Sequence, residues 1–109
     1  MFTNELIIAP IIDAEVDAVV ALWQRCDLTR PWNDAAGDIS RARSRANSDV
    51  LVGHLDNVVT ATVMVGHDGH RGWVYYVAVD PDQRRSGYGR TMMRAAEDWL
   101  RRRGIEKIM

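Results

Sequence analysis

Two arginines and two glycines stand close together in the stretch "VAVDPDQRRSGYGRTMMRAAEDWL", between an apolar run and a run with helical spacing. The start of a helix exposes backbone N–H groups and carries a partial positive charge, which suits it to anions. Glycine lets the backbone approach a ligand closely, and guanidinium groups bind phosphate through charge-assisted hydrogen bonds. The pattern therefore predicts a pyrophosphate site made by the backbone of residues 85–90 and the side chains of Arg84, Arg85 or Arg90.

An ordinary exposed turn with solvated arginines is the alternative interpretation, and spacing alone does not separate the two. Two other phosphate motifs do not fit. The segment from Gly87 to Met92 lacks the third glycine of the dinucleotide-binding fingerprint. The Walker loop requires a lysine beside Ser or Thr, and Lys107 is the only lysine in the chain.

The apolar pattern predicts the elements that would hold this loop. Short apolar runs indicate strands, and a period near 3.6 residues indicates helices. The resulting order is strand, helix, helix, three strands, helix and the start of a strand, which defines a mixed α/β (α+β) domain with antiparallel hairpins and one strand–helix–strand crossover. The expected strands are 5–11, 50–55, 58–66, 73–79 and 105–109, and the expected helices follow Asp13, span 38–48 and span 87–103.

Composition narrows the class of protein. A chain of 109 residues suits one domain, here 1–109, and a net charge of -1 gives no electrostatic case for nucleic acid or an anionic membrane. The apolar runs are much shorter than the ~20 residues of a membrane helix, and the first residues do not resemble a signal peptide. Cys26 is the only cysteine, so we expect a cytoplasmic protein without an internal disulfide.

The segment from Arg84 to Gly89 matches the pattern Arg/Gln-x-x-Gly-x-Gly/Ala of the GNAT superfamily of N-acetyltransferases, and it follows a strand ending in "VAVDP". The whole chain resembles the N-terminal two-thirds of that family, with a central mixed, mostly antiparallel sheet flanked by helices. The segments "LWQRCDLTRPWND" and "GHDGHRGWVYYVAV" resemble the YpeA-type bacterial branch. The resemblance implies acetyl-CoA as the donor and direct attack by an acceptor amine.

The same resemblance implies which residues bind the donor. The loop would hold the CoA pyrophosphate, and the backbone of the preceding strand would pair with the pantetheine arm and help to polarise the thioester carbonyl. In this sequence the cofactor-binding residues are Val77, Ala78, Val79, Arg84, Arg85, Ser86, Gly87, Tyr88, Gly89 and Arg90.

The loop motif does not identify the residues that would transfer protons. Many family members use a tyrosine after the fifth strand as the acid, and this chain stops before that position. Histone-type members place a glutamate where Trp73 stands. Tyr75 and Tyr76 are weak candidates, since alternation along the strand would send one toward the acceptor and the other into the core. A core aromatic is the alternative role for either.

The segment "RPWND" is the second candidate for the acceptor site, because the resemblance places it near the acceptor cleft. Arg30 would bind a carboxylate, Trp32 would form an apolar wall, and Asp34 would attract an amine. The alternative is a loop pinned by Pro31 with a partly buried Trp32 and with Asn33 or Asp34 capping the next helix.

No metal is expected, since His67 and His70 have no further ligands at suitable spacing.

The sequence ends within the expected fifth strand, which suggests a domain truncated at its C-terminus. It would leave Trp99 less covered and the edge of the fourth strand free to pair in a homodimer. Two other functions stay open, a CoA-binding or interaction module without turnover and a nucleotide-phosphate binder.

Overall fold

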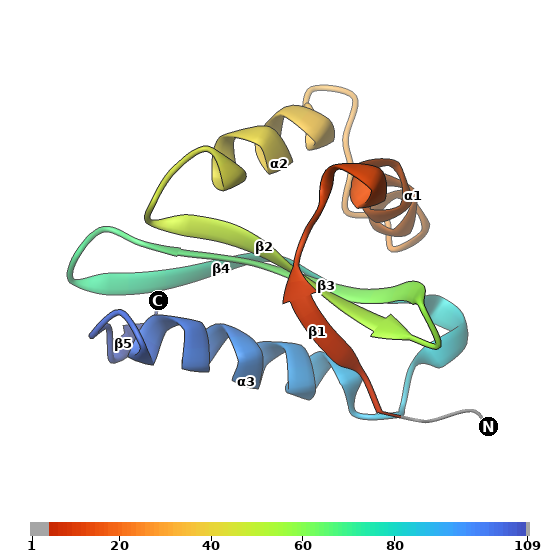
Figure 1. The fold of residues 1–109 in the computed structure, drawn as a ribbon. Coiled ribbons are helices and arrows are strands. Elements are labelled where there is room, and N and C mark those ends of the chain that lie inside the picture. The colour runs from red at the N-terminus through yellow and green to blue at the C-terminus, as the bar shows by residue number, and fades with distance from the viewer. Residues whose placement is uncertain (1–4, 109) are drawn as a thin grey trace.

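Residues 5–108 are described in the computed structural model, and their elements follow the predicted order (Figure 1). Met109, which the predicted last strand includes, lies outside the described residues. The strands are β1 (Ile7–Pro10), β2 (Ser48–Leu55), β3 (Val58–His67), β4 (Arg71–Val79) and β5 (Lys107–Ile108). The helices are α1 (Val16–Arg25), α2 (Ala35–Arg43) and α3 (Tyr88–Arg101), and single 3-10 turns at Asp13–Glu15 and Pro81–Gln83 precede α1 and α3.

The five strands form one sheet in chain order, β1-β2-β3-β4-β5. Neighbours from β1 to β4 are antiparallel, whereas β5 runs parallel to β4 after the α3 crossover. Asp56 and Asn57 connect β2 to β3 with φ angles of 51° and 68°, the left-handed geometry that two-residue hairpin loops use. The predicted mixed α+β fold with a mostly antiparallel sheet is confirmed.

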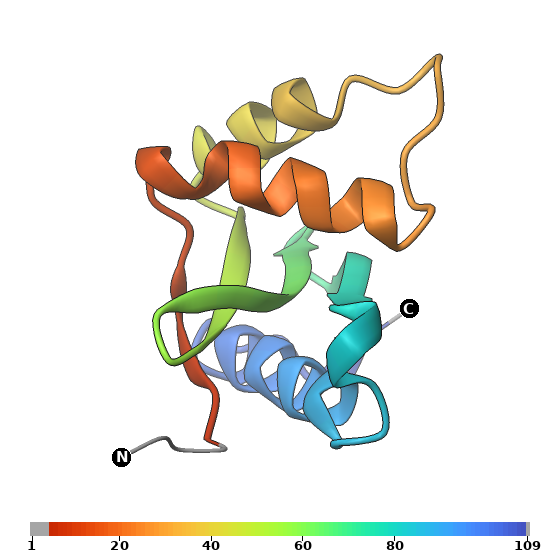
Figure 2. The ribbon, with the colours of Figure 1, turned by 90° about the vertical axis from the view of Figure 1, so that its right-hand side faces the viewer.

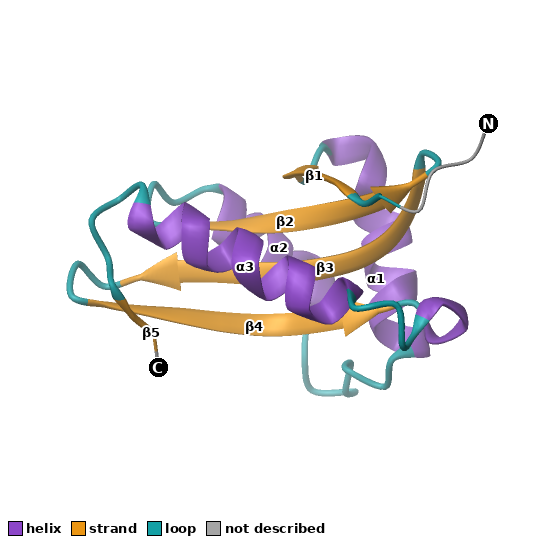
Figure 3. Cartoon of the chain, turned by 90° about the horizontal axis from the view of Figure 1, so that it is seen from below, coloured by secondary structure: helices purple, strands orange, loops and turns teal. Residues whose placement is uncertain are grey.

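The helices cover both faces of the sheet. Helices α1 and α2 lie on one face and α3 crosses the other (Figures 1 and 3), and Figure 2 shows the same layers from the side. Alternate residues of β2 and β3 therefore enter two different cores. Leu51, Ala61, Val63 and Val65 pack against α3, and Val50, Val52 and Met64 pack against α1 and α2. Among the described residues, no helix is long and apolar enough to cross a membrane.

The run "WVYYVAV" is apolar almost throughout, which is typical of a central strand buried on both faces. Strand β4 is not buried in that way, since Tyr75 is 60% exposed and Val77 is 38% exposed. Strand β5 pairs only with Arg71 and Gly72 of β4. The outer edge of β4 is consequently unpaired over most of its length within residues 5–108, which leaves room beside Tyr75 and Val77.

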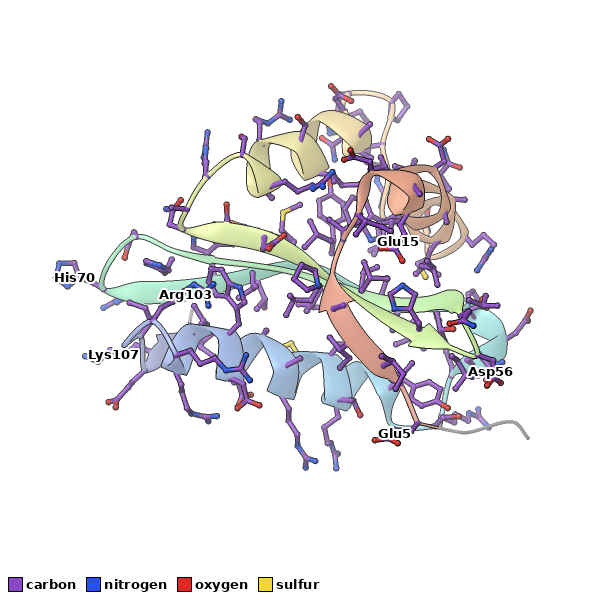
Figure 4. The ribbon with its side chains drawn as sticks, in the orientation of Figure 1. Glu5, Glu15, Asp56, His70, Arg103 and Lys107 are labelled. Atoms are coloured by element: carbon purple, nitrogen blue, oxygen red, sulfur yellow. The ribbon has the colours of Figure 1, made fainter. Side chains whose placement is uncertain are left out.

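Trp99 is also placed differently from the expectation that it would lose cover, since only 7% of its surface is exposed. The Ile105 N–H bonds the Leu100 carbonyl at 3.0 Å, which folds the chain after Gly104 back onto α3 and buries Ile105 in the same core. The Arg103 guanidinium, labelled in Figure 4, lies over the Trp99 ring, 3.5 Å from its centroid.

Candidate active site

A β-bulge interrupts β4 in the middle of the sheet. Thr62 pairs with Ala78 and Met64 pairs with Tyr75, so Tyr76 and Val77 together face a single residue of β3. Tyr76 adopts φ 51°, which is uncommon for a residue with a side chain. The bulge puts Tyr75 and Tyr76 beside the same pocket, and the prediction that they alternate between faces was wrong.

A chain of contacts holds Tyr76 in this conformation. The Trp23 indole N–H donates to the Thr62 hydroxyl at 2.8 Å, and that hydroxyl donates to the Tyr76 carbonyl at 2.9 Å. The Trp23 and Tyr76 rings stack with centroids 3.8 Å apart and planes 8° apart. Trp23 and Thr62 are fully buried, so the two hydrogen bonds fix the bulge from inside the core.

The Tyr76 hydroxyl continues this chain toward α2. It donates to Asp38 at 2.7 Å, and the other oxygen of Asp38 accepts from Arg41. Burial raises the pKa of Tyr76 to about 12, with the hydrogen bond and the negative charge of Asp38 adding to burial and Arg41 opposing it. The Tyr76 hydroxyl is therefore neutral at ordinary pH, and its proton is already donated to Asp38.

A pocket of about 630 Å³ opens beside the two tyrosines. Its walls come from the α1–α2 loop, α2, the turn after α2, the start of β2, and β3 and β4. Trp73 and Tyr75 form an aromatic pair with ring centroids 5.4 Å apart. The lining of the pocket also includes Leu28, Asn33, Asp38, Arg41, Arg45 and Met64.

The loop after β4 is fixed at its first residue. Asp80 accepts from the Asp82 N–H at 2.9 Å and from the Arg25 guanidinium at 2.7 Å, and its own N–H donates to the Thr60 carbonyl at 2.8 Å. Asp80 is thus a turn residue ahead of Pro81, as the sequence predicts. The loop that follows therefore starts from a constrained position at the end of α1.

The loop and the start of α3 enclose a second pocket of about 380 Å³. Gly87 caps α3 with φ 79° and Arg85 has φ 71°, so both residues adopt the left-handed conformation just before the helix. Seven of the predicted cofactor-binding residues line this pocket, and Ala78, Ser86 and Arg90 are not among its walls. The seven are Val77, Val79, Arg84, Arg85, Gly87, Tyr88 and Gly89.

The "RPWND" segment lies apart from the pocket at Tyr76, except for Asn33. Arg30 donates to the carbonyls of Asp27 and Thr29 at 2.9 and 2.8 Å, within its own loop. Asp34 caps α2 by accepting from the Gly37 N–H at 2.9 Å, which confirms the alternative role predicted for it. Trp32 is 79% exposed, so the alternative of a partly buried Trp32 was wrong.

Sequence analysis missed several residues of the larger pocket. Asp38 and Arg41 sit on a polar helix whose orientation is set by packing, and an ordinary surface pair has the same spacing. Only the i, i+3 spacing of these opposite charges signalled an interaction. Among residues 5–108, no three His, Cys, Asp or Glu side chains lie close enough to hold a metal ion.

The comparisons with known proteins agree with this architecture. The model of the acetyltransferase (GNAT) family matches residues 16–109, and the chain belongs to that family. A curated acetyltransferase of Pectobacterium atrosepticum is 42% identical over 94 residues, which make up 86% of this chain and 67% of that protein.

Solved structures show the same fold at low sequence identity. An acetyltransferase from Clostridium acetobutylicum, solved with acetyl-CoA, has a TM-score of 0.79 and 13% identity, over 96% of this chain and 79% of that one. AAC(6')-Iy in complex with a CoA–acetylneamine bisubstrate analogue has a TM-score of 0.80 and 14% identity, over 97% and 78%. An aminoglycoside acetyltransferase from an uncultured soil metagenomic sample, bound to sisomicin, has a TM-score of 0.76 and 16% identity, over 97% and 76%.

Proposed function

We propose that the chain transfers an acetyl group from acetyl-CoA to a primary amine of a small molecule or peptide. The observation that carries this proposal is the placement of the two pockets along β4. Tyr75 and Tyr76 line one pocket, and Val77 and Val79 line the other, so the bulge lies between them. A transferase with two substrates needs such an arrangement, because both must reach one reaction centre.

The smaller pocket fits the donor. The guanidinium groups of Arg84, Arg85 and Arg90 have no carboxylate partner among the described residues. A Cβ at Gly87 would meet no atom within 4 Å, which leaves open space beside the backbone. In this proposal Ser86 and the N–H groups at the start of α3 hold the pyrophosphate, and the backbone of residues 77–79 pairs with the pantetheine arm.

The larger pocket receives the acceptor. The neutral amine nitrogen forms a bond to the thioester carbonyl carbon and the C–S bond breaks. The nitrogen releases one proton to solvent as it becomes the amide, and the sulfur leaves as a thiolate that takes up one proton. Of the two tyrosine candidates, Tyr76 is engaged with Asp38, whereas the Tyr75 hydroxyl has no protein partner among residues 5–108. We assign Tyr75 as the proton donor and Tyr76 as the residue that fixes the bulge.

Two measurements test the proposal. Release of the CoA thiol in the presence of a panel of primary amines reports transfer, and calorimetric titration with CoA reports donor binding. Arg84→Ala should weaken CoA binding by about 1.5–3 kcal/mol, the range of one charge-assisted hydrogen bond. Thiol release that does not depend on any amine would contradict the proposal.

Binding without turnover is the second candidate function, because the sequence contains no counterpart of the tyrosine that many family members use after the fifth strand. It predicts tight CoA binding and no acetyl transfer across the panel. Competition among CoA, desulfo-CoA and ATP addresses the nucleotide-phosphate alternative, which requires ATP to bind as tightly as CoA.

Other features stay predictions. They are membership of the YpeA-type branch, a cytoplasmic location, the single domain of 1–109, and the acceptor role of Arg30, Trp32 and Asp34. We also propose that two copies pair through the outer edge of β4 when CoA is not bound, since this edge carries the exposed Tyr75 and Val77. CoA would compete with this pairing, because residues 77–79 of the same edge are proposed to pair with the pantetheine arm. Light scattering over a range of concentrations tests the dimer, and a monomer throughout would contradict it.

A further inference from the structure

The charges of the larger pocket are unbalanced. It contains two guanidinium groups, Arg41 and Arg45, and one carboxylate, Asp38. Both oxygens of Asp38 are engaged, one by Arg41 and one by the Tyr76 hydroxyl. One positive charge is therefore left over, and it belongs to Arg45.

Arg45 has no ion-pair or hydrogen-bond partner for its guanidinium within residues 5–108. The turn that carries it is nevertheless fixed on both sides. Ser44 donates its backbone N–H to the Ser40 carbonyl at 3.0 Å, and the Asn47 side-chain amide donates to the His67 carbonyl at 2.7 Å. The backbone that carries Arg45 is therefore anchored beside the pocket, and its side chain is exposed there.

The opposite wall is apolar and aromatic. Trp73 and Tyr75 present their rings to the pocket, and Leu28 and Met64 lie among its other walls. Such a surface suits a ligand with an aromatic or apolar body. It offers little to a ligand that carries several ammonium groups, because the only carboxylate in the lining already has two donors.

We propose that the acceptor is an amine with an aromatic or apolar body and a separate anionic group, a carboxylate or a phosphate, which binds Arg45. This inference rests on the proposed acetyl transfer. The anion pairs with the Arg45 guanidinium, the body lies against Trp73 and Tyr75, and the amine points toward the bulge at Tyr76. The acceptor class thereby differs from the aminoglycoside that the soil metagenomic enzyme binds.

Matched pairs of amines test the inference. Benzylamine is compared with para-(aminomethyl)benzoate, and tyramine with tyramine phosphate, using kcat/KM for acetyl transfer. The anionic member of at least one pair should be preferred by about tenfold, as expected for one charge-assisted hydrogen bond at a half-open site. The two pairs distinguish a carboxylate ligand from a phosphate ligand.

Arg45→Ala should abolish most of that preference, measured as the ratio of kcat/KM for the anionic and the neutral member of each pair. Arg43→Ala is the matched control, because it removes the same charge near the same end of α2. Arg43 faces away from the pocket and pairs with Asp13 at 2.5 Å. If both variants lost the preference equally, the preference would come from the overall electrostatic potential of the protein and not from a contact with Arg45. That result would overturn the inference.

A binding measurement separates failure of the inference from failure of the proposed function. The indole N–H signal of Trp73 is followed by NMR as each amine is added to the chain in the presence of CoA. Anion-dependent binding without any transfer would refute turnover and support the ligand class. Transfer without preference for the anionic amines would refute the ligand class and leave the proposed function standing. Absence of both would refute both.

Discussion

Tyr75 and Tyr76 are neighbours in the sequence with different surroundings. The Tyr76 ring stacks on Trp23 and its hydroxyl donates to Asp38, whereas Tyr75 is largely exposed beside the pocket. The same residue type is therefore assigned two roles, one in holding the backbone and one in meeting the substrates. The sequence alone could not assign them, because the bulge depends on how β3 and β4 pair.

Replacing each tyrosine by phenylalanine should separate these roles. Tyr75→Phe is expected to lower kcat for acetyl transfer by about 10²-fold or more, the scale of a lost proton donor, with CoA affinity and thermal stability unchanged. Tyr76→Phe leaves Asp38 without its hydroxyl donor and should lower thermal stability. Steady-state kinetics and thermal melts check both variants. Unchanged kcat in Tyr75→Phe would remove it as the donor.

Gly87 and Gly89 both belong to the loop motif, but they differ in backbone conformation and in the space available for a side chain. Gly87 has φ 79° in open space, so Gly87→Val is strained by its backbone conformation. A Cβ at Gly89 would lie 3.7 Å from Val79, an ordinary contact. Gly89→Ala should therefore keep the stability of the fold, and any loss of CoA binding in calorimetry would report close approach of the ligand. Wild-type affinity in Gly87→Val would contradict the donor site.

The spacing of apolar residues predicts well which strands and helices form and in what order they follow. The strands and the two amphipathic helices follow from their apolar spacing. Helix α3 ends at Arg101 rather than at the predicted 103, and Gly104 with φ 78° lies in the turn that follows. Helix α2 begins at Ala35, earlier than the predicted 38, because Asp34 caps it. The apolar spacing of α2 is weak and does not define where the helix begins. Its start is instead set by one hydrogen bond, which the Asp34 side chain accepts from the Gly37 N–H.

The contact of α1 with β3 and β4 depends on one buried hydroxyl. Thr62→Val keeps the shape of the side chain and leaves the Trp23 indole N–H and the Tyr76 carbonyl without their partner. We expect a loss of about 1–3 kcal/mol in the free energy of unfolding, the range for an unsatisfied buried polar group. Thr60→Val is the control, since the Thr60 hydroxyl bonds only the nearby Val58 carbonyl. Equal losses in urea denaturation would contradict a special role for Thr62.

For the whole molecule, polar contacts of Glu15 and His54 link the segment before α1 to the first two strands of the sheet. Glu15, at the start of α1, contacts His54 of β2, and the other ring nitrogen of His54 lies 3.1 Å from the Ile7 carbonyl of β1 (Figure 4 labels Glu15). The Ile12 N–H donates to Glu15 at 3.0 Å. These contacts bring the turn before α1, β1 and β2 together.

Stability at acid pH should depend on Glu15. Burial raises the pKa of its carboxyl, but the hydrogen bonds from His54 and Ile12 and the charge of His54 outweigh burial and hold it below its ordinary value. A depressed carboxyl pKa contributes stability above the unfolded pKa and loses it as pH falls through the folded pKa. Glu15→Gln should therefore flatten the loss of stability in urea denaturation between neutral pH and pH of about 3. An unchanged acid slope would contradict this contribution.

The larger pocket is a property of the whole molecule, and this explains why sequence analysis found only part of it. Its walls come from the α1–α2 loop, α2 with the following turn, and β2, β3 and β4. Trp73 lies across β3 because position 66 is glycine, where a Cβ would come within 2.1 Å of the Trp73 ring. Such contacts join distant residues, whereas the loop after β4 is local and was predicted from its own residues.

Strand β5 carries Lys107, whose side chain is exposed and which is the only lysine in the chain. Reagents that modify amines therefore have one side-chain target, apart from the chain terminus, while the guanidinium groups around both pockets do not react. A fluorophore or spin label attached at Lys107 would stand opposite Arg71, at the edge of β4, and would report pairing of that edge without altering either pocket. If the chain acetylates itself on a side-chain amine, mass spectrometry should find the modification at Lys107 alone.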